Sequence, residues 1–309
     1  MQMLLLLLYM INLFRNIYTI IIFTRRGLKL REINVDIICE AIKELFINAN
    51  YHLCSDIRNK IDKYRDIEVS QIGKEILDKI IENADMAAKN QVAICQDTGM
   101  SVVFLEVGQE VCFVGGDINE AINEGVRRAY GSGYLRKSVV ADPISRENTK
   151  DNTPAVIYYD IVPGDKVRIQ IMPKGFGSEN MSGIKMLKPS DGVEGITDFV
   201  LDTVIKAGSN PCPPIIVGVG IGGTFEKSAL MAKKALLRSI DKGNADDFYR
   251  ELEIELLKKI NNLGIGPQGM GGITTALGVN IEVYATHIAG LPVAVNITCH
   301  ASRHMETII

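Results

Sequence analysis

The chain has 309 residues, a formal net charge of −3 and six cysteines. It lacks the basic surplus that nucleic-acid binding usually leaves in a composition, and it is long enough to bury a large core without disulfides. Six scattered cysteines with no CxxC pair argue against a disulfide scaffold and favour a reducing, cytoplasmic setting.

The first thirty residues differ from the rest. Met3 to Phe23 is an apolar stretch of transmembrane length, followed by Arg25 and Arg26. One interpretation is a membrane anchor, although the central Arg15 would oppose insertion by about 2.5–3.5 kcal/mol. We favour the other, in which residues 1–30 are an extension absent from the working protein, because residues 31–309 have the pattern of a soluble enzyme and no small-residue cleavage site follows the tract.

Helical periodicity dominates the chain up to about residue 90. Apolar residues recur at helical spacing from Ile37 to Phe46, behind Asn34 as a cap, and again from Ile72 to Ala87. Short apolar runs then predict strands over 92–95, 102–107 and 111–114. The N-terminal region should therefore be helical and pack against sheets.

Helices and strands are mixed in the remainder. Asp117 should cap a helix, and the alternating segments 155–162 and 167–172 should pair with each other through a turn at Pro163–Asp165. Helices are expected from 193 to 204, 225 to 238 and 245 to 263, with strands at 215–218, 281–285 and 292–299. The pattern predicts one α/β domain with more than one sheet, flanked by helices.

Three cysteines stand where apolar strands meet irregular segments, namely Cys95, Cys212 and Cys299. Ligands in α/β folds usually bind at such junctions, and thiolates are the natural ligands of iron–sulfur clusters. Three ligands from distant loops would leave one iron open as a Lewis acid. Separations of 117 and 87 residues carry no ligand signature, so buried free thiols remain the alternative, as for Cys39 and Cys112.

Other polar residues near these junctions have both functional and structural interpretations. Asp97 could shuttle a proton beside Cys95, or simply cap its own turn before Thr98 and Gly99. His287 could hold or protonate a carboxylate, or be a core histidine. Arg136 could grip a carboxylate, or be a solvated charge. His300 and His304 are assigned to a surface or an interface.

Gly218–Gly223 matches the GxGxxG pattern of dinucleotide-binding folds. A second parallel strand carrying an acidic residue should follow its helix, but another helix follows Asp241 instead. We therefore interpret the glycines as a tight strand-to-helix crossing, with a nucleotide-dependent dehydrogenase as the distant alternative.

Five motifs in a fixed order carry a specific resemblance. Together, Ile94–Gly99, Gly177–Asn180, Pro214–Gly223, Gly266–Gly272 and the segment from His287 to Arg303 closely resemble the α subunit of class I fumarases and L-tartrate dehydratases. The resemblance runs from about Ile33 to His304. It implies the fold of the class I fumarase N-terminal domain over residues 31–309, and a hydro-lyase that interconverts fumarate and malate, with L-tartrate dehydration as the alternative.

The resemblance also implies the site. Cys95, Cys212 and Cys299 would hold a 4Fe-4S cluster, and Gln96, Asp97, Arg136 and His287 would contact the dicarboxylate, with Asp97 and His287 as catalytic groups. A backbone contact falls at Gly175 or Gly177. The fused enzymes of the family carry a further C-terminal domain, so here a separate β subunit is expected to complete the site. A non-catalytic iron–sulfur sensor is disfavoured, because it needs neither an acid nor a carboxylate clamp.

Overall fold

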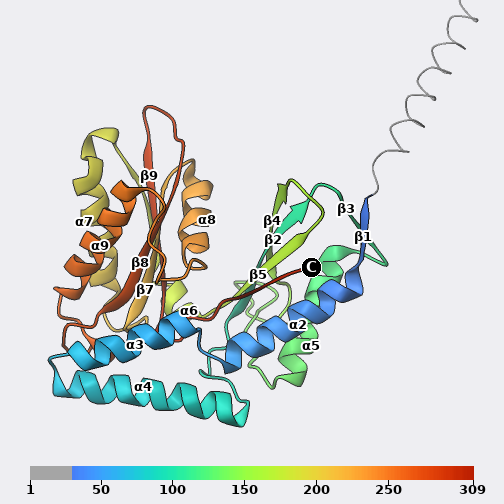
Figure 1. Ribbon diagram of the computed structural model, residues 1–309, viewed down its shortest axis with the longest axis horizontal. Helices are drawn as coiled ribbons and strands as arrows, with labels where there is room; N and C mark the ends of the chain where they lie inside the picture. The colour runs from blue at the N-terminus through green and yellow to red at the C-terminus, as the bar shows by residue number, and fades with distance from the viewer. Residues whose placement is uncertain (1–29) are drawn as a thin grey trace, which may run out of the picture.

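The computed structural model describes residues 30–309, so the interpretation of the apolar tract over residues 1–29 lies outside the described part of the chain. Within residues 30–309, no helix combines the length and the apolar character needed to cross a bilayer. Figure 1 shows two sheets, each with its own helices, and a pair of helices that lies below the left-hand sheet and extends toward the right-hand one.

Three helices open the described chain, of which periodicity predicted the first and the third but not the middle one. A short strand precedes them, and the bounds are β1 Arg31–Asn34, α2 Val35–Tyr51, α3 Ser55–Ile67 and α4 Gln71–Asn90. The Asn34 side chain accepts a hydrogen bond from the Asp36 amide at 2.9 Å, and Ser70 Oγ accepts one from the Gly73 amide at 3.1 Å. Each cap satisfies an otherwise free amide in the first turn.

The first sheet has the strand order β10-β5-β2-β4. Its strands are β2 Met100–Gly108, β4 Val156–Val162, β5 Val167–Lys174 and β10 Met305–Ile308. Alternate residues of β2 face opposite sides: Val103 and Leu105 pack with α2 and with α5, Ile118–Ser132, whereas Val102 and Phe104 face α3 and α4. Strand β3, Val111–Val114, pairs with β1 in a separate two-stranded sheet.

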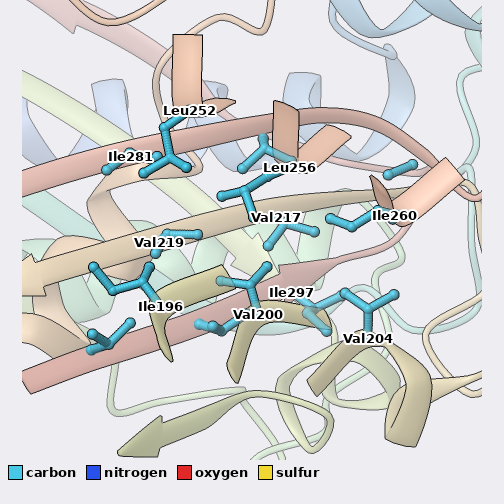
Figure 2. Packing of buried hydrophobic residues seen from close by; sticks show 14 of the residues in the cluster. Ile196, Val200, Val204, Val217, Val219, Leu252, Leu256, Ile260, Ile281 and Ile297 are labelled. Carbon is cyan, nitrogen blue, oxygen red and sulfur yellow. The ribbon is translucent and has the colours of Figure 1, made fainter. Parts of the chain in front are cut away.

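The second sheet has the order β6-β9-β7-β8 and sits between helices. Its parts are β6 Gly183–Leu187, α7 Gly192–Ala207, β7 Ile215–Gly222, α8 Phe225–Ala235, α9 Asp247–Asn261, β8 Ala276–Tyr284 and β9 Leu291–Thr298. Figure 2 shows Val217 and Val219 of β7 meeting side chains from α7 and α9. Burial of each such aliphatic side chain contributes about 1.5–3 kcal/mol before entropy is counted.

The glycines of the GxGxxG match lie on the opposite face of β7, against α8. A Cβ at Gly218 would stand 2.1 Å from the Ala232 carbonyl oxygen, and one at Gly220 would stand 2.1 Å from that of Ser228. These glycines are required because the helix backbone leaves no space for a side chain. They form a packing contact between strand and helix.

A third hydrophobic cluster joins the two sheets. It combines Ile61 of α3 and Leu77 of α4 with Phe104 of β2, Ile216 of β7 and Leu277 of β8. The side chains of α3 and α4 therefore fix one sheet relative to the other. The loop that follows α4 is thereby carried to the N-terminal end of β7.

The predicted α/β class, with a helical N-terminal region and mixed sheets, is confirmed. Two details of the sequence prediction are wrong. Segments 155–162 and 167–172 do not pair with each other, because β2 lies between them and bonds to both. Residues 92–95 are not a strand. Strand β8 runs parallel to β7 but comes after two helices, and the second of these is the helix predicted after Asp241.

Candidate active site

Three loops bring Cys95, Cys212 and Cys299 toward the junction of the two sheets. Cys95 lies between α4 and β2, Cys212 immediately precedes β7, and Cys299 immediately follows β9. Strands β7 and β9 are antiparallel, with Ile216 opposite Thr298, so the second and third cysteines leave the same end of one sheet. The topology explains how residues far apart in the chain meet.

The three thiols influence one another electrostatically. Burial raises the pKa of the Cys212 thiol, and negative charge on Cys299 and on Cys95 raises it further. Burial also raises the pKa of Cys299, against the opposing charge of Arg303, while Cys95 adds to the increase. Mutual destabilisation of thiolates is expected where sulfurs converge, and a bound cation relieves it.

The Cys95 loop is held by side chains from the helical region. The Asn50 carbonyl accepts the Ile94 amide at 2.9 Å, and the Asn83 amide group donates to the Ile94 carbonyl at 2.9 Å. Arg303, which is buried, donates to Asn50 Oδ1 at 2.8 Å and to the Asp97 carbonyl at 2.7 Å. Asparagine bonds therefore replace the strand pairing that the sequence predicted for residues 92–95.

Cys212 adopts a strained backbone, with φ of 55°. Positive φ is uncommon outside glycine and is concentrated at functional sites. The carbonyl of Cys212 lies 2.9 Å from His300 Nδ1, and the Pro213 carbonyl accepts both the backbone amide and Nε2 of Gln268 at 2.8 Å. His300, the residue after Cys299, thus ties the second cysteine loop to the third.

His300 and His304 are partly buried and hydrogen bonded, and their assignment to a surface or interface stays a prediction. Burial lowers the pKa of both imidazoles. His300 Nδ1 faces both the Cys212 carbonyl oxygen, at 2.9 Å, and Gln268 Nε2, at 3.3 Å. The short polar tail after Cys299 gave no periodic signal from which this burial could be predicted.

Asp97 lies beside Cys95 and is fixed by two backbone amides. Its Oδ1 accepts the Gly99 amide at 3.1 Å, as the turn-capping interpretation required, and its Oδ2 accepts the Phe176 amide at 2.9 Å. The second bond joins the Cys95 loop to the glycine loop after β5, which leads into the short helix α6, Phe176–Glu179. Each carboxylate oxygen keeps a second lone pair for another partner.

The two glycines that the sequence could not separate differ in their surroundings. A Cβ at Gly175 would stand 3.1 Å from Asp97 Oδ2, closer than an unstrained contact, whereas one at Gly177 would meet only the Asn210 carbonyl oxygen at 3.5 Å. Gly175 therefore lets the loop backbone approach Asp97, and Gly177 is not needed for that approach.

A buried lysine lies behind the third cysteine. Lys174 is 1% exposed, and its Nζ donates to the Ile297 carbonyl at 2.8 Å and to Ser178 Oγ at 3.0 Å. It also pairs with Glu179 Oε2 at 3.1 Å. Burial lowers the pKa of Lys174 to about 8, although Glu179 opposes the change, and the lysine charge in turn lowers the pKa of Cys299.

Glu179 connects this lysine to the second sheet. Its carboxylate pairs with Lys233 of α8 and accepts Asn296 Nδ2 of β9 at 3.0 Å. Burial opposes ionisation, but Lys174 and Lys233 prevail and lower the pKa of Glu179 to about 2. No local sequence signal marks the partners of Glu179 at positions 233 and 296, because they lie on elements far along the chain.

Glu68 organises the glycine-rich loop that follows α9. Its carboxylate is buried and accepts the Ile273 amide at 3.0 Å and the Thr274 amide at 2.8 Å. A Cβ at Gly272 would stand 2.5 Å from Glu68 Oε1, so the loop closes on the carboxylate only without a side chain there. The same loop carries Gln268 to the Cys212 segment.

Arg136 and Gln96 are exposed beside the first cysteine loop. Thr98 Oγ1 donates to the Arg136 carbonyl at 2.8 Å, which places the arginine next to the Asp97 turn. Its guanidinium has no ion-pair partner among residues 30–309. Gln96 Oε1 lies 3.5 Å from Cys95 Sγ. Both side chains are free to meet an anionic ligand.

His287 is not brought to the cysteines within one chain. It lies in the exposed loop between β8 and β9, next to Thr286, whose hydroxyl donates to the Gly223 carbonyl at 2.8 Å. Gly223 follows the C-terminal end of β7, whereas Cys212 precedes its start. Eight strand residues separate these ends by about 23 Å.

The fold and these contacts define a class of protein. It is an α/β protein with a polar site at the junction of two sheets, where loops carrying three cysteines and an aspartate meet buried lysine and arginine side chains. The chain belongs to the fumarate hydratase (Fumerase) family, whose sequence model matches residues 39–308. It is therefore a hydro-lyase, and the dehydrogenase interpretation of Gly218–Gly223 is not supported.

Curated relatives carry a related name. The chain is 47% identical over 272 residues to a putative L(+)-tartrate dehydratase subunit alpha of Methanocaldococcus jannaschii, covering 86% of this chain and 95% of the relative. It is 34% identical over 252 residues to the L(+)-tartrate dehydratase subunit alpha of Escherichia coli strain K12, covering 80% and 82% of the two chains. The same figures hold for the protein of that name from Shigella sonnei.

Proposed function

We propose that this chain is the cluster-carrying α subunit of an iron–sulfur hydro-lyase that adds water reversibly to fumarate to give malate. The observation that carries the proposal is the joining of the three cysteine loops at one junction. His300, next to Cys299, bonds to the Cys212 carbonyl, and Arg303 bonds to the carbonyl of Asp97, two residues after Cys95. Family membership supports the reaction class.

The residues at the junction fit an iron–sulfur cluster. Burial raises the pKa of Cys299, but the charges of Arg303 and Lys174 oppose that rise and so favour the thiolate that such a cluster requires. Arg303 Nε is buried without a hydrogen-bond partner among the described residues, which leaves a donor available for an anionic group. Cys95, Cys212 and Cys299 would hold a 4Fe-4S cluster, which when bound supplies an iron with a free position as a Lewis acid.

The chain's own residues would bind the substrate and move a proton. Arg136 and Gln96, both exposed beside Cys95, would hold a carboxylate of the substrate. Asp97 keeps free lone pairs beside the first cysteine and would carry the proton at one of its oxygens. The backbone at Gly175 would approach the ligand next to Asp97, because no side chain intervenes.

His287 would act from a second copy of the chain. Its own sheet separates it from the cysteines, but its loop is exposed and carries Ile288, which is 92% exposed, beside the half-exposed Tyr284. Nδ1 of His287 accepts the Ala289 amide at 3.2 Å, so the neutral ring has its proton on Nε2, free to donate to a carboxylate.

The names of the relatives favour a second candidate substrate and a partner. They are called alpha subunits of L(+)-tartrate dehydratases, so L-tartrate is the alternative to fumarate, and a separate β subunit would complete the site. The test is anaerobic co-expression of this chain with the β-subunit gene, followed by assays on fumarate, malate and L-tartrate. We expect the complex to convert fumarate faster than L-tartrate. If it converts L-tartrate alone, L-tartrate takes the place of fumarate as the proposed substrate.

The isolated chain provides the control. It should bind iron and sulfide but turn over slowly, since the partner supplies part of the site. Full activity of the reconstituted chain alone would refute the need for a β subunit. Asp97→Asn in the complex should abolish turnover while leaving cluster absorbance unchanged, and unchanged turnover would remove Asp97 from the mechanism.

A further inference from the structure

A second group of potential metal ligands lies outside the three-cysteine site. Cys54, Asp56 and His304 each offer one ligand atom, and these three atoms all lie within 4.8 Å of one another. Cys54 and Asp56 stand at the start of α3, while His304 lies just before β10. None of them takes part in the proposed hydration.

The distances suit a single small ion. Cys54 Sγ is 3.8 Å from His304 Nδ1. A tetrahedral zinc ion, with bonds of about 2.3 Å to sulfur and about 2.0 Å to nitrogen, holds such atoms about 3.5 Å apart. The ring and the thiol therefore need to move by only a few tenths of an ångström to share an ion.

The surroundings hold the ligands ready. Asp56 is buried, and its two oxygens accept the Ile57 amide at 2.9 Å and the Ile240 amide at 3.1 Å, which fixes the carboxylate and leaves a lone pair on each oxygen. Among residues 30–309, the hydrogen-bond partners of the Cys54 thiol are the carbonyl and ring of His304. His304 also lines a cavity of about 550 Å³, from which water can reach the group.

We propose that Cys54, Asp56 and His304 form a binding site for a divalent transition-metal ion of the zinc class, with water from the adjacent cavity as the fourth ligand. Sulfur, nitrogen and oxygen donors in this combination favour zinc over magnesium or calcium, which prefer oxygen alone. The ion would join the start of α3 to the segment after Cys299 and so brace the third cysteine loop from outside.

Burial raises the pKa of the Cys54 thiol to about 11, so an ion must displace its proton to bind. Only a cation with strong affinity for thiolate can meet that requirement, which again favours zinc.

The test uses the full chain with its cluster assembled anaerobically, so that Cys95, Cys212 and Cys299 are occupied. After incubation with zinc chloride and desalting, elemental analysis should find about one zinc per chain. The extended X-ray absorption fine structure of zinc should show one sulfur neighbour at about 2.3 Å. A shell of three sulfurs would place zinc in the cluster site and overturn the proposal, as would no retained zinc.

Matched variants complete the test. Cys54→Ser and His304→Gln should each lose the zinc, whereas Cys112→Ser, another partly buried cysteine away from both sites, should retain it. Zinc should raise the melting temperature of the unsubstituted chain by a few degrees and leave that of Cys54→Ser unchanged. Equal zinc retention by all the variants would refute the site, and His304→Gln decides the question if Cys54→Ser does not fold.

Discussion

The two ends of the β7–β8–β9 sheet hold their loops in different ways. At the cysteine end, buried groups such as Glu68, Lys174 and Arg303 bond to loops from distant parts of the chain. At the other end, residues 285–289 are exposed, and the hydroxyl of Thr286 is the side-chain bond that ties them to Gly223. One end is organised within the chain, and the other is free to meet a partner.

Preorganised polar groups favour chemistry at the first end, because they are fixed before a ligand binds. An exposed loop with a free histidine favours contact between chains at the second. The predictions below test whether this contrast between the two ends is functional.

The largest effect is expected at the cysteine end. Cys212→Ser should prevent stable cluster assembly and reduce activity by more than the roughly 10–100-fold typical of changes in outer-shell residues. Iron content and visible absorbance of the reconstituted protein measure the loss. Cys112→Ser, in β3, should leave both unchanged. A cluster retained at full occupancy in Cys212→Ser would remove this ligand from the proposal.

The histidine end is tested by mixing two inactive variants. Asp97→Asn and His287→Asn should each lack activity alone, yet restore activity when they are co-assembled. A pair made of one copy of each variant contains one intact site out of two. Random pairing makes about half of the pairs mixed, so about a quarter of wild-type activity should return. Steady-state rates before and after subunit exchange provide the measurement. If the subunits exchange and assemble but activity does not return, His287 does not act in the site of a second copy of the chain.

The ion pairs behind Cys299 should make stability depend on acid. Because the pKa of Glu179 is depressed to about 2, its stabilisation is complete above the unfolded pKa near 4.5 and is lost as pH falls from there toward 2. The contribution is on the order of 3 kcal/mol. Urea unfolding of the full chain at several pH values should show this loss, and Glu179→Gln should flatten it.

Glu251→Gln, an exposed position on α9, is the control for that series and should follow the unsubstituted chain. An identical acid response in Glu179→Gln would mean that other carboxylates govern the loss.

A smaller effect should separate the two glycines of the loop before α6. Gly175→Ala places a Cβ 3.1 Å from Asp97 Oδ2 and should displace the carboxylate by a few tenths of an ångström. A misplacement of about 1 Å can reduce turnover on the order of 100-fold, so this smaller displacement should reduce it by less than that. Gly177→Ala meets an ordinary contact and should stay near wild-type activity. Values of kcat for the two variants test the difference, and equal loss in both would contradict the assigned roles.

Local pattern predicted the helices well because their amphipathic faces and caps lie within a few residues. Asn34 and Asp117 cap their helices as expected. Strand pairing was harder to predict: the segments that end at Val162 and begin at Val167 are separated by a short turn, yet each bonds to β2. Closeness in the sequence favours a hairpin between the two segments. In the structure the buried strand β2, which comes earlier in the chain, pairs with one of them along each of its edges.

The candidate site was predictable only in part, for a related physical reason. Cys95 and Asp97 are neighbours in the chain, so their proximity needed no fold. Arg303 and Asn50 are 253 residues apart, and Lys174 contacts Ile297 across 123 residues. No local signal marks such long-range partners. The position of His287 at the far end of the sheet likewise follows from strand direction, which the sequence pattern did not specify.

Mössbauer spectroscopy of the reconstituted, anaerobic complex tests the central claim most directly. The account predicts a cluster in which addition of malate or fumarate changes the signal of a single iron and leaves the other irons unchanged, because three cysteines leave one iron without a protein ligand. A spectrum in which every iron is equivalent and indifferent to the dicarboxylate would contradict it.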